Sequence, residues 1–411
     1  MKELRDYQVE KAKEAHGVLC KLGCVYISAE VRCGKTLMSL ETARLYGAQC
    51  VLFLTKKNAI SSIESDYKDF GYDKHFSMIV INDESMHKLQ QLDFDLIIHD
   101  EHHRTGAFPK PGSKTKLFKK LFFGKPMIFL SGTPSPESFC QLYHQFWVTP
   151  NGPWTAYSNF YKWANLYVNK KEKRIGTHTV FDYSDGHEDM IMQAVEPYMV
   201  RFTQAQAGFT SSIDEEVLTV EMKPQTYSMC AKLLKDLVIQ GKDEVILADS
   251  PVKLQQKLHQ MYSGTIKFES GNRMVLDTSK ADFLKSHFAT SKIAIFYKFV
   301  AELDCLKQVL GDRLTTDIDE FNSDPMKWYA VQIISGREGT SYAAADYLVF
   351  YNIDFSATSY FQGRDRLTTM DRLSNKVYWL FSRGGIEEKI YKAVKKKKPY
   401  TLSFFKKDYL K

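Results

Sequence analysis

Residues 29–36, Ala-Glu-Val-Arg-Cys-Gly-Lys-Thr, have the types and spacing of a loop that binds phosphate. The apolar run at residues 24–27 precedes the loop, and a helical pattern follows it. In that context, backbone N–H groups of the loop and of the helix N-terminus can cradle phosphate. Lys35 would reach the terminal phosphates of a nucleotide, and the Thr36 hydroxyl would hold magnesium. The other loop residues expected to bind the nucleotide are Arg32, Cys33 and Gly34. The alternative is a glycine-containing turn before a helix.

A second buried-strand pattern, residues 94–99, ends in the carboxylates Asp100 and Glu101. Open α/β sheets bind their ligands at the carboxyl ends of strands, so both side chains are candidates for chemistry. Asp100 would hold magnesium, and Glu101 would orient and deprotonate an attacking water. Phosphoryl transfer depends mostly on positioning and charge stabilisation, so one lysine, one metal and one carboxylate nearly suffice. The alternative is an acidic strand end that is simply solvated.

A third apolar strand, residues 127–130, ends in Ser-Gly-Thr-Pro at positions 131–134. These three strand-end motifs, in this order, resemble motifs I, II and III of superfamily 2 helicases and translocases. The resemblance implies ATP and Mg²⁺ as cofactors. It also implies that three residues couple the ATP site to a nucleic-acid site, namely His103, Ser131 and Thr133.

The resemblance extends back to Leu-Arg-Asp-Tyr-Gln at positions 4–8, which is similar to the adenine-reading Q motif. It implies that Gln8 hydrogen-bonds the adenine edge and that Arg5 or Tyr7 packs nearby. On the sequence alone, Arg5 and Gln8 are ordinary first-turn helix residues.

Composition sets broad limits on the class of protein. A chain of 411 residues predicts two domains of ordinary size. No apolar run is long enough for a membrane-spanning helix, and the charged N-terminus has no secretory signal. Seven scattered cysteines predict a reducing, cytoplasmic compartment with no disulfide framework and no metal cluster. The net charge of +7 is compatible with a polyanionic partner and offers no reason to expect a membrane partner.

Residues 1–140 alternate strand and helix patterns, which predicts a parallel sheet covered by helices on both faces. The strand at 51–54 ends in polar residues, and the family places nucleic-acid contacts at such a strand end. Thr55, Lys56 and Lys57 could donate to phosphate oxygens there. A polar loop that caps the next helix is an equally good account of any single one of them.

Residues 141–195 differ from the rest of the chain because aromatic and basic residues are interleaved there. This region is predicted to be an insertion or linker. Aromatic and basic residues together suit base stacking and contact with a nucleic-acid backbone. Phe160, Trp163 and Tyr167 recur at helical spacing, however, which favours a buried face. We therefore expect core packing for most of the aromatics and nucleic-acid contact for the lysines.

The second lobe is expected at residues 196–411, where three further apolar strands alternate with helical patterns. Those strands are expected at 293–297, 331–334 and 347–351. The predicted fold is therefore α/β, with two tandem RecA-like lobes built on parallel sheets. The family resemblance implies an ATP site in the cleft between the lobes.

Residues 362–366, Gln-Gly-Arg-Asp-Arg, resemble motif VI, which supplies arginine fingers. We expect Arg366 to be the finger, with Arg364 beside it at the phosphates and Gln362 coupling the sites. The family has two arginines three positions apart, whereas three on from Arg366 is Thr369. Gly339 resembles part of motif V, which touches nucleotide and nucleic acid.

The segment 385–390 resembles the tail of the Swi/Snf-like group, and the small size is similar to phage-encoded members. The resemblance implies an ATP-dependent DNA helicase or double-stranded DNA translocase, with DNA the favoured partner. One alternative is an RNA helicase of the same superfamily. Another is a nucleic-acid-binding clamp with a structural ATP site. Proteins of replication, recombination or repair are further candidate partners, since the chain could be the motor subunit of such a complex.

Overall fold

The computed structural model describes residues 2–89, 93–175, 178–208, 212–241, 243–336, 342–368, 374–396 and 399–410. The chain divides into two compact units, Met1–Phe209 and Thr210–Lys411. This division lies later than the expected start of the second lobe at residue 196, because strand β8 (Met199–Phe202) completes the first sheet. No helix among the described residues is long and apolar enough to cross a membrane.

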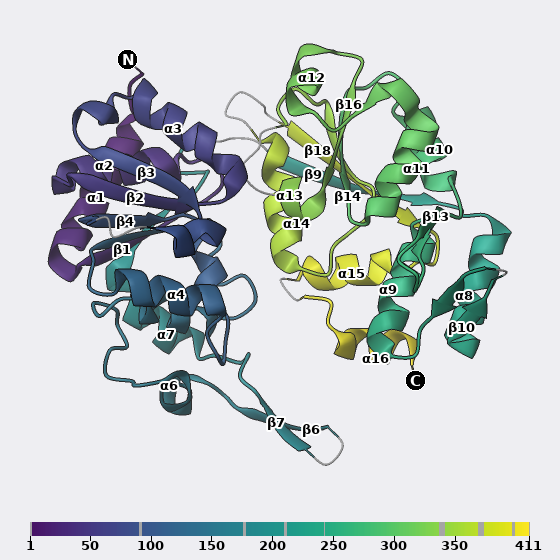
Figure 1. The fold of residues 1–411 in the computed structure, drawn as a ribbon, viewed down its shortest axis with the longest axis horizontal. Helices are drawn as coiled ribbons and strands as arrows, with labels where there is room; N and C mark the ends of the chain where they lie inside the picture. The colour runs from purple at the N-terminus through teal and green to yellow at the C-terminus, as the bar shows by residue number, and fades with distance from the viewer. Residues whose placement is uncertain are drawn as a thin grey trace. The chain divides into compact units, whose positions relative to one another are not determined.

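The first unit is built on a six-stranded, entirely parallel sheet with strand order β3-β2-β4-β5-β1-β8 (Figure 1). The other strands are β1 (Cys24–Ala29), β2 (Cys50–Thr55), β3 (Ser77–Asn82), β4 (Leu96–His99) and β5 (Met127–Leu130). The helices are α1 (Asp6–Leu22), α2 (Lys35–Tyr46), α3 (Ile60–Asp69), α4 (Ser113–Phe122), α5 (Gln141–Trp147), α6 (Phe160–Tyr167) and α7 (Glu188–Val195). A two-stranded hairpin, β6 (Lys171–Ile175) with β7 (His178–Asp182), extends from the region after α6.

Successive residues of the central strands enter two different cores, one on each face of the sheet. In β1, Val25 and Ile27 pack with α1 and α2, whereas Cys24 and Tyr26 pack with the aromatic cluster of α4 to α7. Burial on both faces explains why these strands read as continuous apolar runs in the sequence. Phe160 and Trp163 lie in the aromatic core, which confirms core packing for these two residues.

The second unit is a second six-stranded parallel sheet, with strand order β15-β16-β14-β17-β18-β9. Its strands are β9 (Ser212–Val220), β14 (Ile293–Tyr297), β15 (Leu314–Thr315), β16 (Trp328–Gln332), β17 (Tyr347–Phe350) and β18 (Ser374–Ser382). Two small hairpins accompany it, β10 (Val238–Gln240) with β11 (Val245–Leu247), and β12 (Thr265–Lys267) with β13 (Arg273–Val275). Together the two sheets confirm the predicted α/β fold of two RecA-like lobes.

Helices cover both faces of this second sheet and enclose two further apolar cores. They are α8 (Pro224–Asp236), α9 (Pro251–Tyr262), α10 (Ser279–His287), α11 (Val300–Leu310), α12 (Ile318–Ser323), α13 (Ile333–Gly336), α14 (Ala357–Arg364), α15 (Glu387–Val394) and α16 (Leu402–Tyr409). The strand expected at 331–334 begins three residues earlier, as β16, and ends at Gln332. Ile333 and Ile334 belong instead to the short helix α13. Ile333 is buried in one of the apolar cores, whereas Ile334 is 56% exposed. The apolar run in the sequence therefore did not show whether these two residues belong to a strand or to a helix.

Candidate active site

Three neighbouring strands of the first sheet, β4, β5 and β1, bring the three strand-end motifs to one edge. Ile128 of β5 pairs with Val25 of β1 on one side and with Ile98 of β4 on the other. Because all three strands run in the same direction, the segments that follow them leave the sheet at the same end. The segments that begin at Glu30, Asp100 and Ser131 are therefore neighbours, where open α/β sheets hold ligands.

The loop between β1 and α2 turns through two left-handed residues, Arg32 (φ 65°) and Gly34 (φ 79°). The Lys35 Nζ donates to the carbonyl oxygens of Ala29, at 2.9 Å, and of Glu30, at 3.3 Å, so it lies against the loop. The first-turn N–H groups of α2 have no acceptor within their own helix. An ammonium and free helix N–H groups at one loop are the donor set that a polyphosphate needs.

Gln8 lies directly against this loop. It is 5% exposed, its Oε1 accepts a hydrogen bond from Arg5 N at 2.9 Å, and a Cβ on Gly34 would lie 2.1 Å from its Nε2. Only glycine can therefore occupy position 34 without displacing Gln8. The exposed Arg5 donates from Nη1 to the Tyr7 hydroxyl at 3.2 Å, and the Tyr7 ring stacks on Phe202.

Asp100 follows β4 and is held from two sides. Its Oδ2 accepts from the Thr55 hydroxyl at 2.9 Å, and its Oδ1 accepts from Glu101 N at 2.9 Å. Burial and the neighbouring Glu101 charge raise the pKa of Asp100, against a lowering effect of Lys35. A cation would stabilise the ionised forms of two adjacent carboxylates in such a poorly solvated position. In the described part of the chain, no three His, Cys, Asp or Glu side chains group closely enough to hold a metal alone.

Glu101 has a left-handed backbone (φ 48°), which turns the chain into a short 3₁₀ segment, His102–Thr105. The Glu101 Oε2 lies 3.1 Å from His103 Nδ1, and the same nitrogen lies 2.9 Å from the Ser131 hydroxyl. Burial alone would raise the pKa of Glu101. The hydrogen bond and charge of His103, aided by Lys35 and Lys56, instead lower it to about 2.

The two histidines after Glu101 have different surroundings. His103 faces the carboxylate, whereas His102 is fully buried, stacks on Phe129 at 3.8 Å and places its Nε2 2.8 Å from the Gln145 carbonyl oxygen. Burial, with the charge of His99 adding to it, keeps the pKa of His102 well below its ordinary value. His102 is thus a neutral anchor for the turn that presents Glu101.

The remaining predicted site residues of the first unit differ in burial and in their contacts. Thr36 is half-buried in the first turn of α2, and the Ser131 hydroxyl accepts from Thr133 N at 3.1 Å. Cys33 is buried, and burial raises the pKa of its thiol to about 11, so it is an unreactive packing group. Lys57 is exposed and Lys56 is half-buried near Glu101.

Thr55 does not lie at a surface where nucleic acid could meet it. Its side chain is 1% exposed, and its hydroxyl is occupied by Asp100. The expectation of a phosphate contact is therefore replaced by a supporting role for a site carboxylate. The strand β2 neighbours β4, which places the ends of the two strands side by side.

In the second unit, the motif-VI-like residues lie on α14 and the 3₁₀ turn after it. Gln362 and Arg366 are buried, at 3% and 8% exposure. Arg364 donates from Nη1 to Glu215 Oε1 at 2.9 Å and lies over the Tyr360 ring. Gly339 lies outside the described residues.

Two residues that hold parts of the predicted sites were missed from the sequence, one at the phosphate loop and one at Arg364. Gln204, just after β8, donates from its backbone N to Glu30 Oε2 at 2.7 Å and from Nε2 to Val31 O at 2.9 Å. It follows a four-residue strand in a polar segment, and no motif marks it. Glu215, which holds Arg364, likewise sits in a run of acidic residues that predicts only a solvated surface.

No family model matches the chain, and no curated protein matches it. Among solved structures, the chain is similar to one described as the Sulfolobus solfataricus SWI2/SNF2 ATPase core in complex with dsDNA. The identity is 15%, the match covers 99% of this chain and 92% of that one, and the TM-score is 0.42. Neither the identity nor the TM-score is high enough for this likeness to bear on function.

Proposed function

We propose that the protein is an ATP-dependent motor acting on nucleic acid, with DNA as its track. One observation supports this most directly. Lys35, Asp100 and Glu101 gather at one strand edge, and His103 joins Glu101 to Ser131 of the neighbouring strand segment. A simple nucleotide-binding clamp needs the lysine but has no use for an oriented carboxylate joined to the next strand.

Each residue has a role that follows from its surroundings. The Lys35 ammonium would leave the loop carbonyls and bind the terminal phosphates, which carry more charge. Glu101 would orient the attacking water. With its pKa lowered to about 2 it is a weak base, so it would take the proton only late, once the phosphoryl group has largely departed. Arg366 and Arg364 of the second unit are the proposed partners of the developing charge.

Thr36 and Asp100 would hold Mg²⁺, whose chemistry is to neutralise charge on the phosphate oxygens. The raised pKa of Asp100 fits this role, because a nearby cation would stabilise the ionised carboxylate. Gln8, beside Gly34, is the proposed reader of the adenine edge, and Arg5 and Tyr7 are proposed to flank the base.

Ser131 and Thr133 are proposed to couple hydrolysis to movement. The Ser131 hydroxyl contacts both His103 and the backbone of Thr133. Because His103 also contacts Glu101, a movement of Glu101 would be transmitted to the segment after β5. Exposed Lys57 and half-buried Lys56 are proposed contacts to the nucleic-acid backbone, which the net charge of +7 also favours.

The test is the rate of ATP hydrolysis without nucleic acid and with single-stranded DNA, duplex DNA, forked DNA or RNA, at low and moderate salt. Strong stimulation by one DNA form would support a DNA motor and identify its track. Stimulation by RNA alone would favour an RNA helicase. Absence of both hydrolysis and stimulation would favour a clamp with a structural ATP site.

A further inference from the structure

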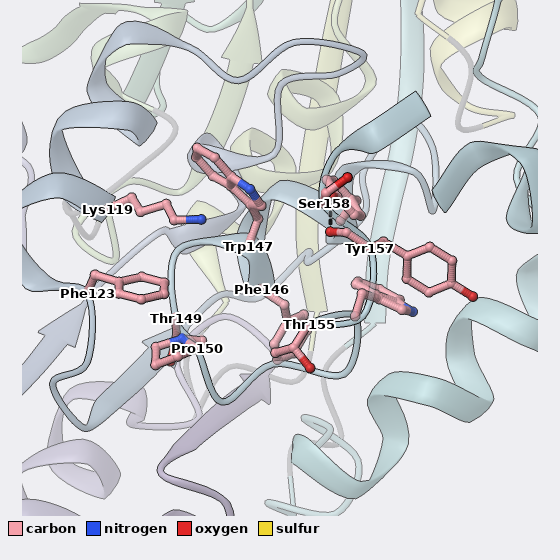
Figure 2. A pocket seen from close by; sticks show the side chains of 11 residues that line it. Lys119, Phe123, Phe146, Trp147, Thr149, Pro150, Thr155, Tyr157 and Ser158 are labelled. Atoms are coloured by element: carbon pink, nitrogen blue, oxygen red, sulfur yellow. Dashed lines mark hydrogen bonds between the residues drawn. The ribbon is translucent and has the colours of Figure 1, made fainter. Parts of the chain in front are cut away.

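A cavity in the first unit lies away from the strand edge that carries the candidate active site. It has a volume of about 280 Å³ and lies among α4, α5 and the turn that follows α5 (Figure 2). Sites for drug-sized ligands occupy about 300–1,000 Å³, so this cavity suits a single ring system and little more. None of the proposed roles above uses it.

Aromatic rings form much of its wall. Phe123 is 51% exposed, and Trp147 and Tyr157 are half-buried, whereas the aromatic residues deeper in this region are core. In Figure 2, Phe123 and Trp147 lie on one side of the lining residues, and the Tyr157 ring lies on the other side and points away from them. Half-exposed rings around one small cavity are suited to stacking on a flat, aromatic ligand.

One lysine stands at this wall. The Lys119 Nζ lies 3.6 Å from the centroid of the Trp147 ring and 5.0 Å from that of Phe123. Burial lowers the pKa of Lys119, and no carboxylate of the described residues pairs with it. None of the lining residues is acidic, and Thr149 and Ser158 add hydroxyl groups. The site therefore favours a ligand that combines an aromatic ring with an anion.

The helix that carries Lys119 continues the positive charge beyond the cavity. Within α4, Lys116 and Lys120 are both exposed, and the helix contains no acidic residue. Residues four positions apart lie on one side of a helix, so Lys116 and Lys120 share one side of α4, the helix whose Lys119 lines the cavity. A ring-sized aromatic cavity lined by a helix that is rich in lysine matches a polymer of alternating phosphates and bases.

We propose that this cavity binds one unpaired base of a nucleic-acid strand, stacked against Trp147, with the α4 lysines on the flanking phosphates. This inference rests on nucleic acid being the partner in the proposed function, and it adds a base-binding site outside the ATP site. It gives the motor a contact with single-stranded or locally opened nucleic acid. Stacking tolerates any base, so the site confers no sequence preference.

The experiment compares binding of labelled oligo(dT) with binding of an abasic strand of the same length, by fluorescence anisotropy without ATP. The wild-type protein should bind oligo(dT) about 5- to 100-fold more tightly, as expected for base–aromatic stacking. Trp147→Leu should bring this ratio towards one and leave affinity for the abasic strand unchanged. Tyr161→Leu is the matched control, because Tyr161 is 42% exposed on α6 and does not line the cavity.

Lys119→Gln should reduce the salt dependence of binding by about one released counterion, whereas exposed Lys13→Gln on α1 should not. A wild-type ratio near one, or a ratio unchanged in Trp147→Leu, overturns the proposal. Displacement by a short aromatic peptide but not by oligo(dT) would identify a protein ligand and overturn the proposal as well.

ATPase stimulation, measured in parallel, distinguishes failure of the base-binding site from failure of the proposed function. Stimulation with an unchanged ratio removes only the base site, whereas no stimulation by any nucleic acid removes the proposed function.

Discussion

Glu215 Oε1 accepts a hydrogen bond from Arg364 Nη1 at 2.9 Å, so a guanidinium proposed to act on ATP is held by a carboxylate of its own unit. Glu215 also accepts from the Tyr360 hydroxyl, at 2.8 Å, and from Trp379 Nε1, at 2.9 Å. The carboxylate is therefore the centre of a network between β9, α14 and β18. If Arg364 acts at the phosphates, it does so from a position in which Glu215 already binds its guanidinium.

Replacing Glu215 with Gln should lower the free energy of unfolding of the second unit by roughly 2 kcal/mol. Breaking a fully buried pair costs about 3–5 kcal/mol, but Arg364 keeps 27% exposure and can be hydrated instead. Urea unfolding followed by the fluorescence of the contacting Trp379 measures the change. Glu216→Gln is the matched control, because Glu216 is 46% exposed and its pair with Lys376 should contribute under about 1 kcal/mol. Equal effects of the two substitutions would contradict the network.

Lys35→Ala should strongly reduce ATP hydrolysis and leave the fold intact. Among the described residues, the ammonium bonds only to loop carbonyls, which solvent can also satisfy, so stability depends little on it. Loss of a charged group that binds the transition state typically lowers kcat about 10²- to 10³-fold. Steady-state hydrolysis and circular dichroism measure both properties, with exposed Lys13→Ala as the control. Normal hydrolysis by the Lys35 variant would remove this loop from the mechanism.

Gln8→Ala should raise KM for ATP about tenfold and narrow the preference for ATP over GTP, because one hydrogen bond to the base is lost. Gly34→Ala should act on the same contact, since its Cβ would lie 2.1 Å from Gln8 Nε2. Nucleotide-dependence curves for ATP and GTP separate the effects, with exposed Gln49→Ala as the control. An unchanged ATP/GTP ratio in Gln8→Ala would show that adenine is read elsewhere.

Ser131→Ala should reduce nucleic-acid stimulation more than basal hydrolysis. The hydroxyl joins His103 to Thr133 N, but it touches neither Lys35 nor Asp100 in the contacts described. Rates with and without the stimulating nucleic acid give the ratio directly, and exposed Ser62→Ala controls for loss of a hydroxyl. If both rates fell in proportion, Ser131 would belong to the hydrolysis step itself.

The parts of the fold that were predictable share one physical property. Strands such as β1 and β5 are buried on both faces, so they appear as uninterrupted apolar runs bounded by polar loops. Strand β9 was missed because most of its residues are exposed and it contains Asp-Glu-Glu, although it pairs along its whole length with β18. Its place in the sheet is decided by its partner strand, which no local pattern reveals.

Some features of the candidate site could likewise be predicted from the sequence, and others could not. Asp100 and Glu101 follow a buried strand, and that alone predicts their position at the carboxyl end of β4. The destination of Thr55 depends on which strand neighbours β2, and the turn of Glu101 toward His103 depends on a left-handed backbone that its residue type does not favour. These details are set by tertiary contacts.

Asp277 offers a test of stability against pH in the second unit. It is 1% exposed, and its carboxylate accepts from Thr226 Oγ1 and Lys223 N, each at 2.7 Å, and from the N and Oγ of Ser279. Burial alone would raise its pKa, but these hydrogen bonds favour the anion and lower the pKa below its ordinary value. Asp277→Asn should therefore lower the free energy of unfolding by about 2–3 kcal/mol at neutral pH.

The sign of the pH dependence follows from the direction of the shift. Because the folded-state pKa lies below the unfolded value of about 3.9, the stabilisation is complete above that value. It is lost as the pH falls through the lowered folded-state pKa. The difference between the wild type and Asp277→Asn should stay constant from about pH 5 to 8 and shrink below about pH 4. Urea unfolding across this range, with exposed Asp236→Asn as the control, measures it. A difference that grew toward acid pH would mean that the carboxyl is protonated in the folded protein and that its hydrogen bonds favour the neutral form.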